Sequence, residues 1–306
     1  MQIVCCVSEI PDRIGNYRIE QVLGTIGVAV ILEGVHDILP RVAQIKTLRG
    51  SATGVAAYNM QILREACVLE TLHHPGVPQI YESGILPDRR PWFVTERAIG
   101  TQLVEHIGRG ALPVLEVTWL VRDVAAILEH AHRRGVIHSA LRPESISLAP
   151  GRAVIHDWSM SRAHDAPPNS SAPVRGHYTA PELVAGEAID DRADVYALGV
   201  IAYQAITGAL PRVHRDTPHI PTSERRPDAP QELALLIDQM LERDRSDRPQ
   251  TGDIREDLEW LADMLHQPQP RKQQREHTGR WTPPMGGVAT QIIAGEIGSG
   301  RATTED

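Results

Sequence analysis

The sequence has few cysteines, no long apolar run and no excess of basic residues, and each of these observations argues against a class of protein. Three cysteines among 306 residues, with no secretion-like leader, argue against a disulfide framework and predict a cytoplasmic protein. No run of about 18 apolar residues occurs, so we expect no membrane span. The formal charge of −8 gives no reason to expect nucleic-acid binding. The proportions of hydrophobic residues (42%) and charged residues (23%) are ordinary for a soluble folded chain.

Lysine is also scarce. Of the 31 basic residues only Lys46 and Lys272 are lysines, and the others are arginines. A position that needs nothing more than positive charge would therefore usually carry arginine in this chain. Lys46 is thus a candidate for a specific role.

Apolar patterning divides the chain into a strand-rich first part and a helical second part. After a weakly patterned lead-in over 1–15, we expect strands over 17–23, 30–32 and 42–46, a helix over 59–72, and a further strand that begins at Trp92. The first helix is predicted from the spacing of Met60, Leu63, Ala66, Val68 and Leu69. Later apolar stripes predict helices over 117–131, 194–208, 231–243 and 251–265.

The last forty residues differ in composition. From Gln267 onward they are rich in Gln, Pro, Gly, Thr and charge, which predicts a disordered tail over 267–306. Its short apolar segment around 289–293 is a candidate motif for binding a partner.

The segment Val136–Ile146 carries the most informative motif. It resembles the catalytic loop of the eukaryotic-type (Hanks-type) Ser/Thr protein kinases, whose common form is H-R-D-L-K-P-E-N. The residues that match this form are His138, Leu141, Pro143 and Glu144. Two positions differ: Ala140 stands where the family has its catalytic-base Asp, and Ser145 where it has a metal-binding Asn.

A second resemblance concerns the loop that covers the ATP phosphates in this family. Gly24 begins, and Ile31 ends, a segment similar to the kinase glycine-rich loop G-x-G-x-x-G-x-V. Ile26 and Ala29 replace the other two glycines. Glycine lets backbone N–H groups approach a phosphate closely, so a β-branched Ile26 obstructs that approach.

Three charged residues lie where the family binds ATP and Mg²⁺. Lys46 ends a segment similar to the V-A-I-K strand, whose lysine pairs with the phosphates and with a helix glutamate, here Glu65. Asp157 begins Asp-Trp-Ser, which resembles the metal-binding D-F-G. Two interpretations stay open: this trio binds nucleotide with Mg²⁺, or it is a buried ion-pair network that braces the fold.

The resemblance also places residues around the adenine ring. Thr95 is at the gatekeeper position, and the hinge residues Glu96 and Ala98 would follow the adenine edge. Gln44 replaces a small residue that usually roofs the ring, and Ser147 replaces an apolar residue that usually forms its floor. We therefore expect a more polar adenine slot.

Other matching residues are structural in the family. His138 and Trp158 would pack together, Asp194 would brace the catalytic loop, and Glu182 would pair with Arg248. These residues occur in the family's order at plausible intervals. The resemblance thus implies an α+β, bilobal kinase fold, with a β-rich N-lobe over 16–100 and a mainly helical C-lobe over 101–266. The compact motifs resemble those of bacterial members.

The substitutions in the cleft lead to two hypotheses of function. The first is a pseudokinase, a kinase-like protein without its catalytic base that acts as a regulator or scaffold through protein partners. The second is an active Ser/Thr kinase that transfers the ATP γ-phosphate through a rearranged site. Its base would be Glu144, His156 or Asp165, although their spacing favours none of them.

Overall fold

The computed structural model describes residues 10–52, 54–97, 100–163, 176–211 and 219–266. The predictions for Ala98, for Asp165 and for the tail over 267–306 fall outside these ranges. Residues 1–267 form one compact unit. Among the described residues, no helix has the length and apolar character needed to cross a lipid bilayer.

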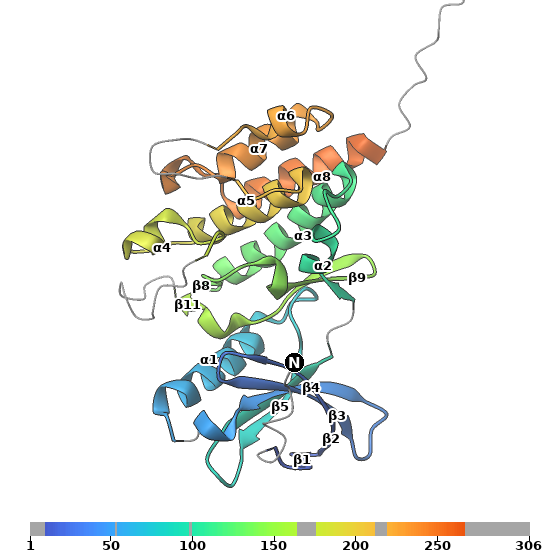
Figure 1. The fold of residues 1–306 in the computed structure, drawn as a ribbon, viewed down its shortest axis with the longest axis vertical. Coiled ribbons are helices and arrows are strands. Elements are labelled where there is room, and N and C mark those ends of the chain that lie inside the picture. The colour runs from blue at the N-terminus through green and yellow to red at the C-terminus, as the bar shows by residue number, and fades with distance from the viewer. Residues whose placement is uncertain (1–9, 53, 98–99, 164–175, 212–218, 267–306) are drawn as a thin grey trace, which may run out of the picture. The chain divides into compact units, whose positions relative to one another are not determined.

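Six antiparallel strands form the sheet of the N-lobe, in the order β1-β2-β3-β4-β6-β5 (Figure 1). They are Arg13–Ile14 (β1), Tyr17–Ile26 (β2), Ala29–His36 (β3), Val42–Leu48 (β4), Ile80–Ile85 (β5) and Pro91–Glu96 (β6). β2 and β3 meet at a tight turn in which Gly27 has a φ of 58°. β2 therefore extends to Ile26, beyond the predicted strand end at Leu23.

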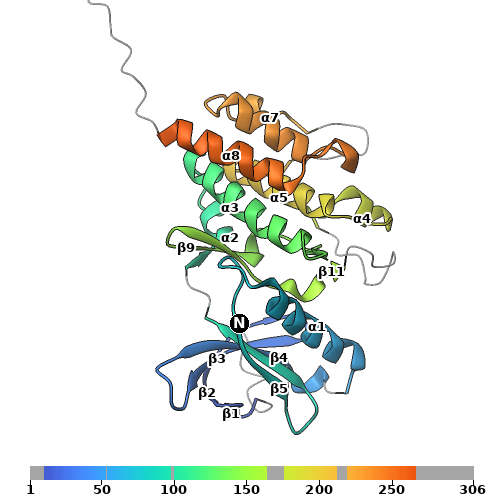
Figure 2. The same cartoon turned by 180° about the vertical axis from the view of Figure 1, so that it is seen from behind.

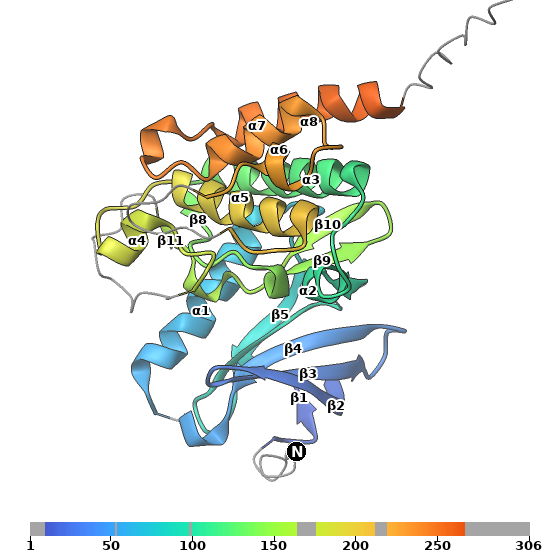
Figure 3. The same ribbon diagram turned by 45° about the horizontal axis from the view of Figure 1, so that its top comes forward.

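Helix α1 (Ala56–Leu72) packs against β4, β5 and β6, as Figure 3 shows from a tilted view. Its buried residues are Ile62, Glu65, Ala66, Leu69 and Leu72. Met60 and Leu63 contributed to the prediction of this helix, but they are 49% and 38% exposed. The helix is confirmed, and the prediction was wrong about part of the face that it buries.

The C-lobe is built mainly from helices. They are Leu103–Ile107 (α2), Val114–His132 (α3), Pro181–Ala185 (α4), Arg192–Thr207 (α5), Thr222–Arg225 (α6), Gln231–Met240 (α7) and Thr251–His266 (α8). α5 packs against α3 and α7, and α8 lies along α3 (Figure 2). Nearly every residue of α5 is buried, in agreement with its apolar sequence.

Two small sheets hold the loops that face the N-lobe. β7 (Thr101–Gln102), β9 (Ile146–Ala149) and β10 (Arg152–Ile155) form one, and β8 (Val136–Ile137) pairs with β11 (Arg162–Ala163) in the other. The segment with the altered catalytic-loop motif runs from β8 to β9. Asp157 lies two residues after the end of β10, so the two sheets place both motifs on the same side of the C-lobe.

Candidate functional site

Residues from both lobes line a cleft of about 470 Å³. From the predicted nucleotide and metal site it contains Gly24, Ile31, Lys46, Glu65 and Asp157. It also contains the three residues predicted to make the adenine slot polar or to guard it, Gln44, Thr95 and Ser147. Segments far apart in the sequence thus meet where the kinase resemblance places them.

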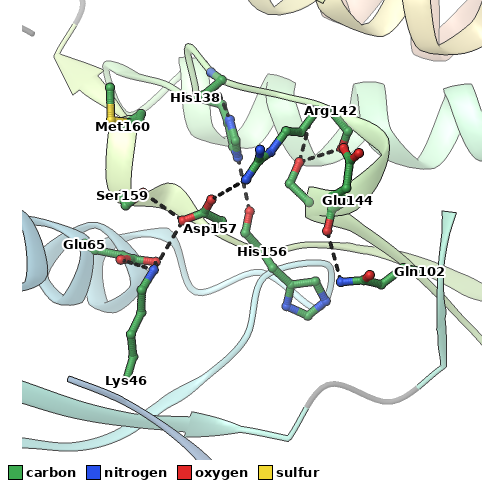
Figure 4. Close-up of polar contacts among 12 residues, drawn as sticks. Lys46, Glu65, Gln102, His138, Arg142, Glu144, His156, Asp157, Ser159 and Met160 are labelled. Carbon is green, nitrogen blue, oxygen red and sulfur yellow. Dashed lines mark hydrogen bonds and ion pairs between the residues drawn. The ribbon is translucent and has the colours of Figure 1, made fainter. Parts of the chain in front are cut away.

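Lys46 is the centre of a buried ion-pair cluster (Figure 4). Its Nζ lies 2.8 and 2.7 Å from the two carboxylate oxygens of Glu65 on α1, and 3.2 Å from Oδ1 of Asp157. The side chains of Lys46 and Glu65 are only 6% and 3% exposed. The pair therefore ties β4 to α1, and through Asp157 it reaches the C-lobe.

Arg142 extends this cluster with a side chain that is 44% exposed, and sequence reasoning missed it. Its Nη2 lies 3.3 Å from Oδ2 of Asp157, the carboxylate oxygen that Lys46 does not contact. The hydroxyl of Ser159 donates to Oδ1 at 2.7 Å. Both oxygens of Asp157 are thus already paired with protein groups (Figure 4). The available signal was the position of Arg142, where the loop motif H-R-D-L-K-P-E-N has its own cation.

The pKa values reflect this mutual pairing. Burial acts to raise the pKa of Asp157, but Lys46, Ser159 and His138 together hold it below its ordinary value. Burial raises the pKa of Glu65 from 4.5 to about 7, against the opposite effect of Lys46. The pKa of Lys46 is raised, because its two carboxylate neighbours outweigh its burial. When Lys46, Arg142, Glu65 and Asp157 are all ionised, the two cations balance the charge of the two carboxylates.

Ser145, at the metal-binding Asn position, is committed to its own loop. Its hydroxyl donates to the backbone carbonyl of Arg142 at 2.8 Å and accepts from the backbone N–H of Arg142 at 3.1 Å. Ser145 is 2% exposed. Its oxygen stabilises the loop turn.

Around Ala140, at the base position, the surface offers few groups that accept a proton. Ala140 lines a hollow beside the cleft that also contains Lys46, Arg142 and Asp157. In the described part of the chain, Asp157 is the only carboxylate that lines this hollow, and no histidine does. Two cations and a hydroxyl already occupy that carboxylate.

The other candidate bases in the described chain lie in the cleft and not around Ala140. Glu144 and His156 both line the cleft. Burial lowers the pKa of His156 to about 4, so its imidazole is neutral at neutral pH. Figure 4 shows Glu144 near Gln102, whose amide donates to the Glu144 backbone carbonyl at 3.3 Å.

The inner end of the cleft is polar. Gln44 on β4 and Thr95 on β6 are direct cross-strand partners, and Ser147 lies on β9 in the C-lobe. Thr95 and Ser147 are 5% and 3% exposed. Glu96 does not line this cleft, and its carboxylate lies 3.8 Å from Nη2 of Arg152.

The glycine-rich segment keeps little of its backbone freedom. Gly24 lies within β2 opposite Ile31, and a Cβ added there would meet nothing within 4 Å. Ile26 lines the cleft and is 39% exposed. Ala29 is buried in the core at the start of β3. The sheet itself therefore does not require glycine at position 24.

The predicted structural residues make extensive contacts beneath the cleft. Asp194 accepts hydrogen bonds from the backbone N–H groups of His138 and Ser139, each at 2.8 Å, and contacts His132 at 2.9 Å. It thereby fixes the start of the loop, where Ser139 has a φ of 64°. The rings of His138 and Trp158 lie 4.7 Å apart edge to face.

A second buried ion pair lies within the C-lobe. Arg248 donates to both carboxylate oxygens of Glu182, at 2.7 and 2.9 Å. Its guanidinium also donates to the backbone carbonyls of Arg192, Glu242 and Arg243. This pair links α4 and α5 to the turn before α8.

The site fits the two parts of Mg-ATP differently. The volume of the cleft is in the range of known ligand pockets, and Lys46 is the residue that would face a phosphate. The magnesium donor set does not fit, because Asp157 is paired and Ser145 is turned into its loop. Within the described residues, no group of three or more His, Cys, Asp or Glu side chains could hold a metal ion.

A bilobal α+β fold with a buried lysine–glutamate pair in the inter-lobe cleft defines the protein kinase class. Residues 17–260 match the sequence model of the protein kinase domain. This is well over half of the chain, so the chain belongs to the protein kinase family. The predicted kinase resemblance and the predicted fold are thus confirmed.

The chain is similar to bacterial Ser/Thr kinases. It is 30% identical over 264 residues to serine/threonine-protein kinase pkn3 of Myxococcus xanthus, which covers 78% of this chain and 48% of pkn3. It is 29% identical over 204 residues to PknJ of Mycobacterium tuberculosis, covering 64% of this chain and 34% of PknJ. The chain thus spans between a third and a half of the length of these relatives.

A solved structure gives the same fold. The crystal structure of the Mycobacterium tuberculosis PknI kinase domain superimposes with a TM-score of 0.64 and 25% sequence identity. The match covers 83% of this chain and 98% of the PknI domain.

Proposed function

We propose that this kinase-family protein is a pseudokinase, which regulates or scaffolds protein partners without phosphotransfer. The observation that carries the proposal is the state of Asp157. Lys46 and Ser159 engage one of its oxygens and Arg142 the other. The carboxylate that would bind magnesium is instead paired within the ion-pair cluster around Lys46.

The missing base supports the same proposal. In protein kinases an Asp of the catalytic loop accepts the proton of the substrate hydroxyl. Loss of a general base typically costs on the order of 10²–10⁴ in rate. Ala140 has no acceptor atom, and the nearest carboxylate in the hollow around it is the paired Asp157.

The cluster of Lys46, Glu65, Arg142 and Asp157 then has a structural role. It joins β4 and α1 of the N-lobe to the loop and the β10 end of the C-lobe. We propose that this cluster braces the two lobes and so presents a fixed surface to partners. Nucleotide binding in the cleft is weak and independent of magnesium.

Phosphotransfer with γ-labelled Mg-ATP and generic protein substrates tests the proposal. We expect the wild-type protein to incorporate no more label than Lys46→Met or Asp157→Asn. An active bacterial Ser/Thr kinase assayed in parallel controls for the substrates. Label transfer by the wild type that both substitutions abolish would contradict the pseudokinase proposal.

One observation favours the second candidate, an active Ser/Thr kinase. Lys46 and Glu65 are joined at 2.7 Å, which is the pairing that an active kinase requires. Under this alternative another residue would replace the catalytic-base Asp that is missing at position 140, and Glu144 and His156 are the described candidates in the cleft. Glu144→Gln and His156→Gln would then each lower the rate of label transfer.

A further inference from the structure

The inner end of the inter-lobe cleft carries three neutral polar side chains that need a partner. Gln44, Thr95 and Ser147 line the cleft, and none of them makes a side-chain hydrogen bond to another residue that the structure describes. Thr95 and Ser147 are only 5% and 3% exposed. Buried polar groups in folded proteins almost always have a hydrogen-bond partner. Two buried hydroxyls that border a cavity therefore indicate a partner that enters the cavity.

These polar groups approach the cavity from both lobes. Gln44 and Thr95 are cross-strand partners on β4 and β6 of the N-lobe, whereas Ser147 lies on β9 of the C-lobe. His156 also lines the cleft, and its buried Nε2 has no hydrogen-bond partner in the described chain. A flat aromatic base has its hydrogen-bonding groups at its edge and presents apolar faces above and below. A molecule with hydroxyl groups on several sides can pair with both lobes at once.

The charges of the cleft do not favour an anionic ligand. Of the described residues that line it, Lys46 and Arg142 are the two with a permanent positive charge, and they face Glu65 and Asp157. Glu144 adds a third, exposed carboxylate. Active kinases offset the charge of the ATP phosphates with magnesium, whose donor set does not fit here. A phosphate group would therefore enter this cleft without a compensating charge.

Apolar side chains form the rest of the wall around these polar groups. Ile31, Leu69 and Phe93 line the cleft and are 7%, 5% and 3% exposed. Apolar walls with a few convergent polar groups are typical of small-molecule sites, and a volume of about 470 Å³ is within their range. The C–H faces of a sugar ring pack against such walls, while its hydroxyls reach the polar groups.

We propose that the cleft binds an uncharged, hydroxyl-rich small molecule, a free sugar or a nucleoside, in preference to a nucleoside phosphate. The hydroxyls of Thr95 and Ser147 and the amide of Gln44 pair with the hydroxyl groups of this ligand. Because these side chains belong to different lobes, the ligand ties the two lobes together. This inference rests on the pseudokinase proposal, since an active kinase has to bind ATP with magnesium.

Saturation-transfer NMR titrations of the full chain, with EDTA present throughout, test this preference. The probes are maltose and myo-inositol for the sugar source, adenosine for the nucleoside source, and ATP for the phosphorylated form. We expect at least one uncharged probe to bind, and ATP to bind about tenfold more weakly, equivalent to about 1.4 kcal/mol. Binding by maltose or myo-inositol alone identifies a sugar site, and binding by adenosine alone identifies a nucleoside site.

Substitutions that remove a hydroxyl locate the binding. Thr95→Val and Ser147→Ala should each weaken binding of the uncharged probe about tenfold, equivalent to about 1.4 kcal/mol. Neither should lower the unfolding midpoint of the free protein, because these hydroxyls have no partner among the described residues to lose. The control Ser83→Ala removes an exposed hydroxyl on β5 outside the cleft and should change affinity less than about twofold.

Three results would overturn the inference. They are tighter binding by ATP than by every uncharged probe, equal affinities of Ser147→Ala and Ser83→Ala, and no binding by any probe at millimolar concentration, in which case the two hydroxyls meet only water. All three leave the pseudokinase proposal standing if the label-transfer assay remains negative. Label transfer by the wild type would instead remove the pseudokinase proposal itself, so the two failures are distinguishable.

Discussion

At the scale of single residues, the proposal that this kinase cleft serves a structural role rests on the partners of Asp157. An aspartate that binds magnesium must keep oxygens available for the metal, whereas Lys46, Ser159 and Arg142 occupy both oxygens of Asp157. Taking charges out of water is unfavourable unless they are paired and hydrogen-bonded. The balanced cluster meets that requirement without a ligand.

Lys46→Met tests the structural role of the cluster. It leaves Glu65 buried without its cation, and breaking a buried ion pair typically costs roughly 3–5 kcal/mol. We expect urea unfolding to show a loss of that size. The double change Lys46→Met with Glu65→Leu removes the orphaned carboxylate and should recover most of it. A Lys46→Met protein as stable as wild type would show that the pair does not brace the fold.

Glu65 makes stability depend on pH in a defined direction. Its pKa is raised from 4.5 to about 7 in the folded state, so the folded chain holds this proton more tightly than the unfolded chain. The stabilisation is therefore fully present below about pH 4.5 and is lost as pH rises through about 7. We expect the unfolding free energy of wild type to fall relative to Glu65→Gln across this interval. Urea titrations in steps of pH measure the difference, and a constant difference would contradict the raised pKa.

The substitutions at cleft positions could be recognised from the sequence, but the contacts that these residues make could not. Ala140 and Ser145 are visible as departures from the loop motif. The contact of Arg142 with Asp157 joins residues from different motifs, and it depends on how the loop and the β10 end pack. The turn of the Ser145 hydroxyl into its own loop is likewise a property of local backbone geometry.

At the scale of elements, helix α1 shows the limit of apolar periodicity. The pattern predicted its existence, but Met60 and Leu63 are exposed and Ile62 is buried. The helix is oriented by the burial of Glu65 against Lys46, in line with Ile62 and Leu69 on the same face. The buried face of the helix thus includes a charged residue, which a hydrophobic pattern alone does not report.

The altered loop is held by Asp194 at the first turn of α5. Asp194→Ala would leave the backbone N–H groups of His138 and Ser139 without their acceptor. An unsatisfied buried donor typically costs about 1–3 kcal/mol. We expect faster hydrogen exchange at these two amides and a matching loss of stability. Asp191→Ala is the control, because the Asp191 side chain makes no capping hydrogen bond at the same helix end. Unchanged exchange in Asp194→Ala would show that the loop does not need this brace.

At the scale of the whole molecule, the order of motifs predicted the fold and the family. Lys46, Glu65, Asp157, Asp194 and Arg248 come from separate elements, and the structure brings each to a place that the kinase resemblance gives it. Such long-range agreement arises because these residues make contacts between elements that are far apart in the sequence.

The central claim is that Lys46, Glu65, Arg142 and Asp157 pair with one another in the cleft, and we propose that this pairing leaves no place for magnesium. Thermal unfolding with ATP in the presence of either magnesium or EDTA tests it most directly. A nucleotide at 100-fold above its Kd stabilises a fold by about 2.7 kcal/mol, and the smaller stabilisation by weak binding is followed by raising the ATP concentration. The account predicts the same midpoint with ATP whether magnesium or EDTA is present, once each is referred to a control without nucleotide. A stabilisation by ATP that requires magnesium and disappears in Asp157→Asn would contradict it.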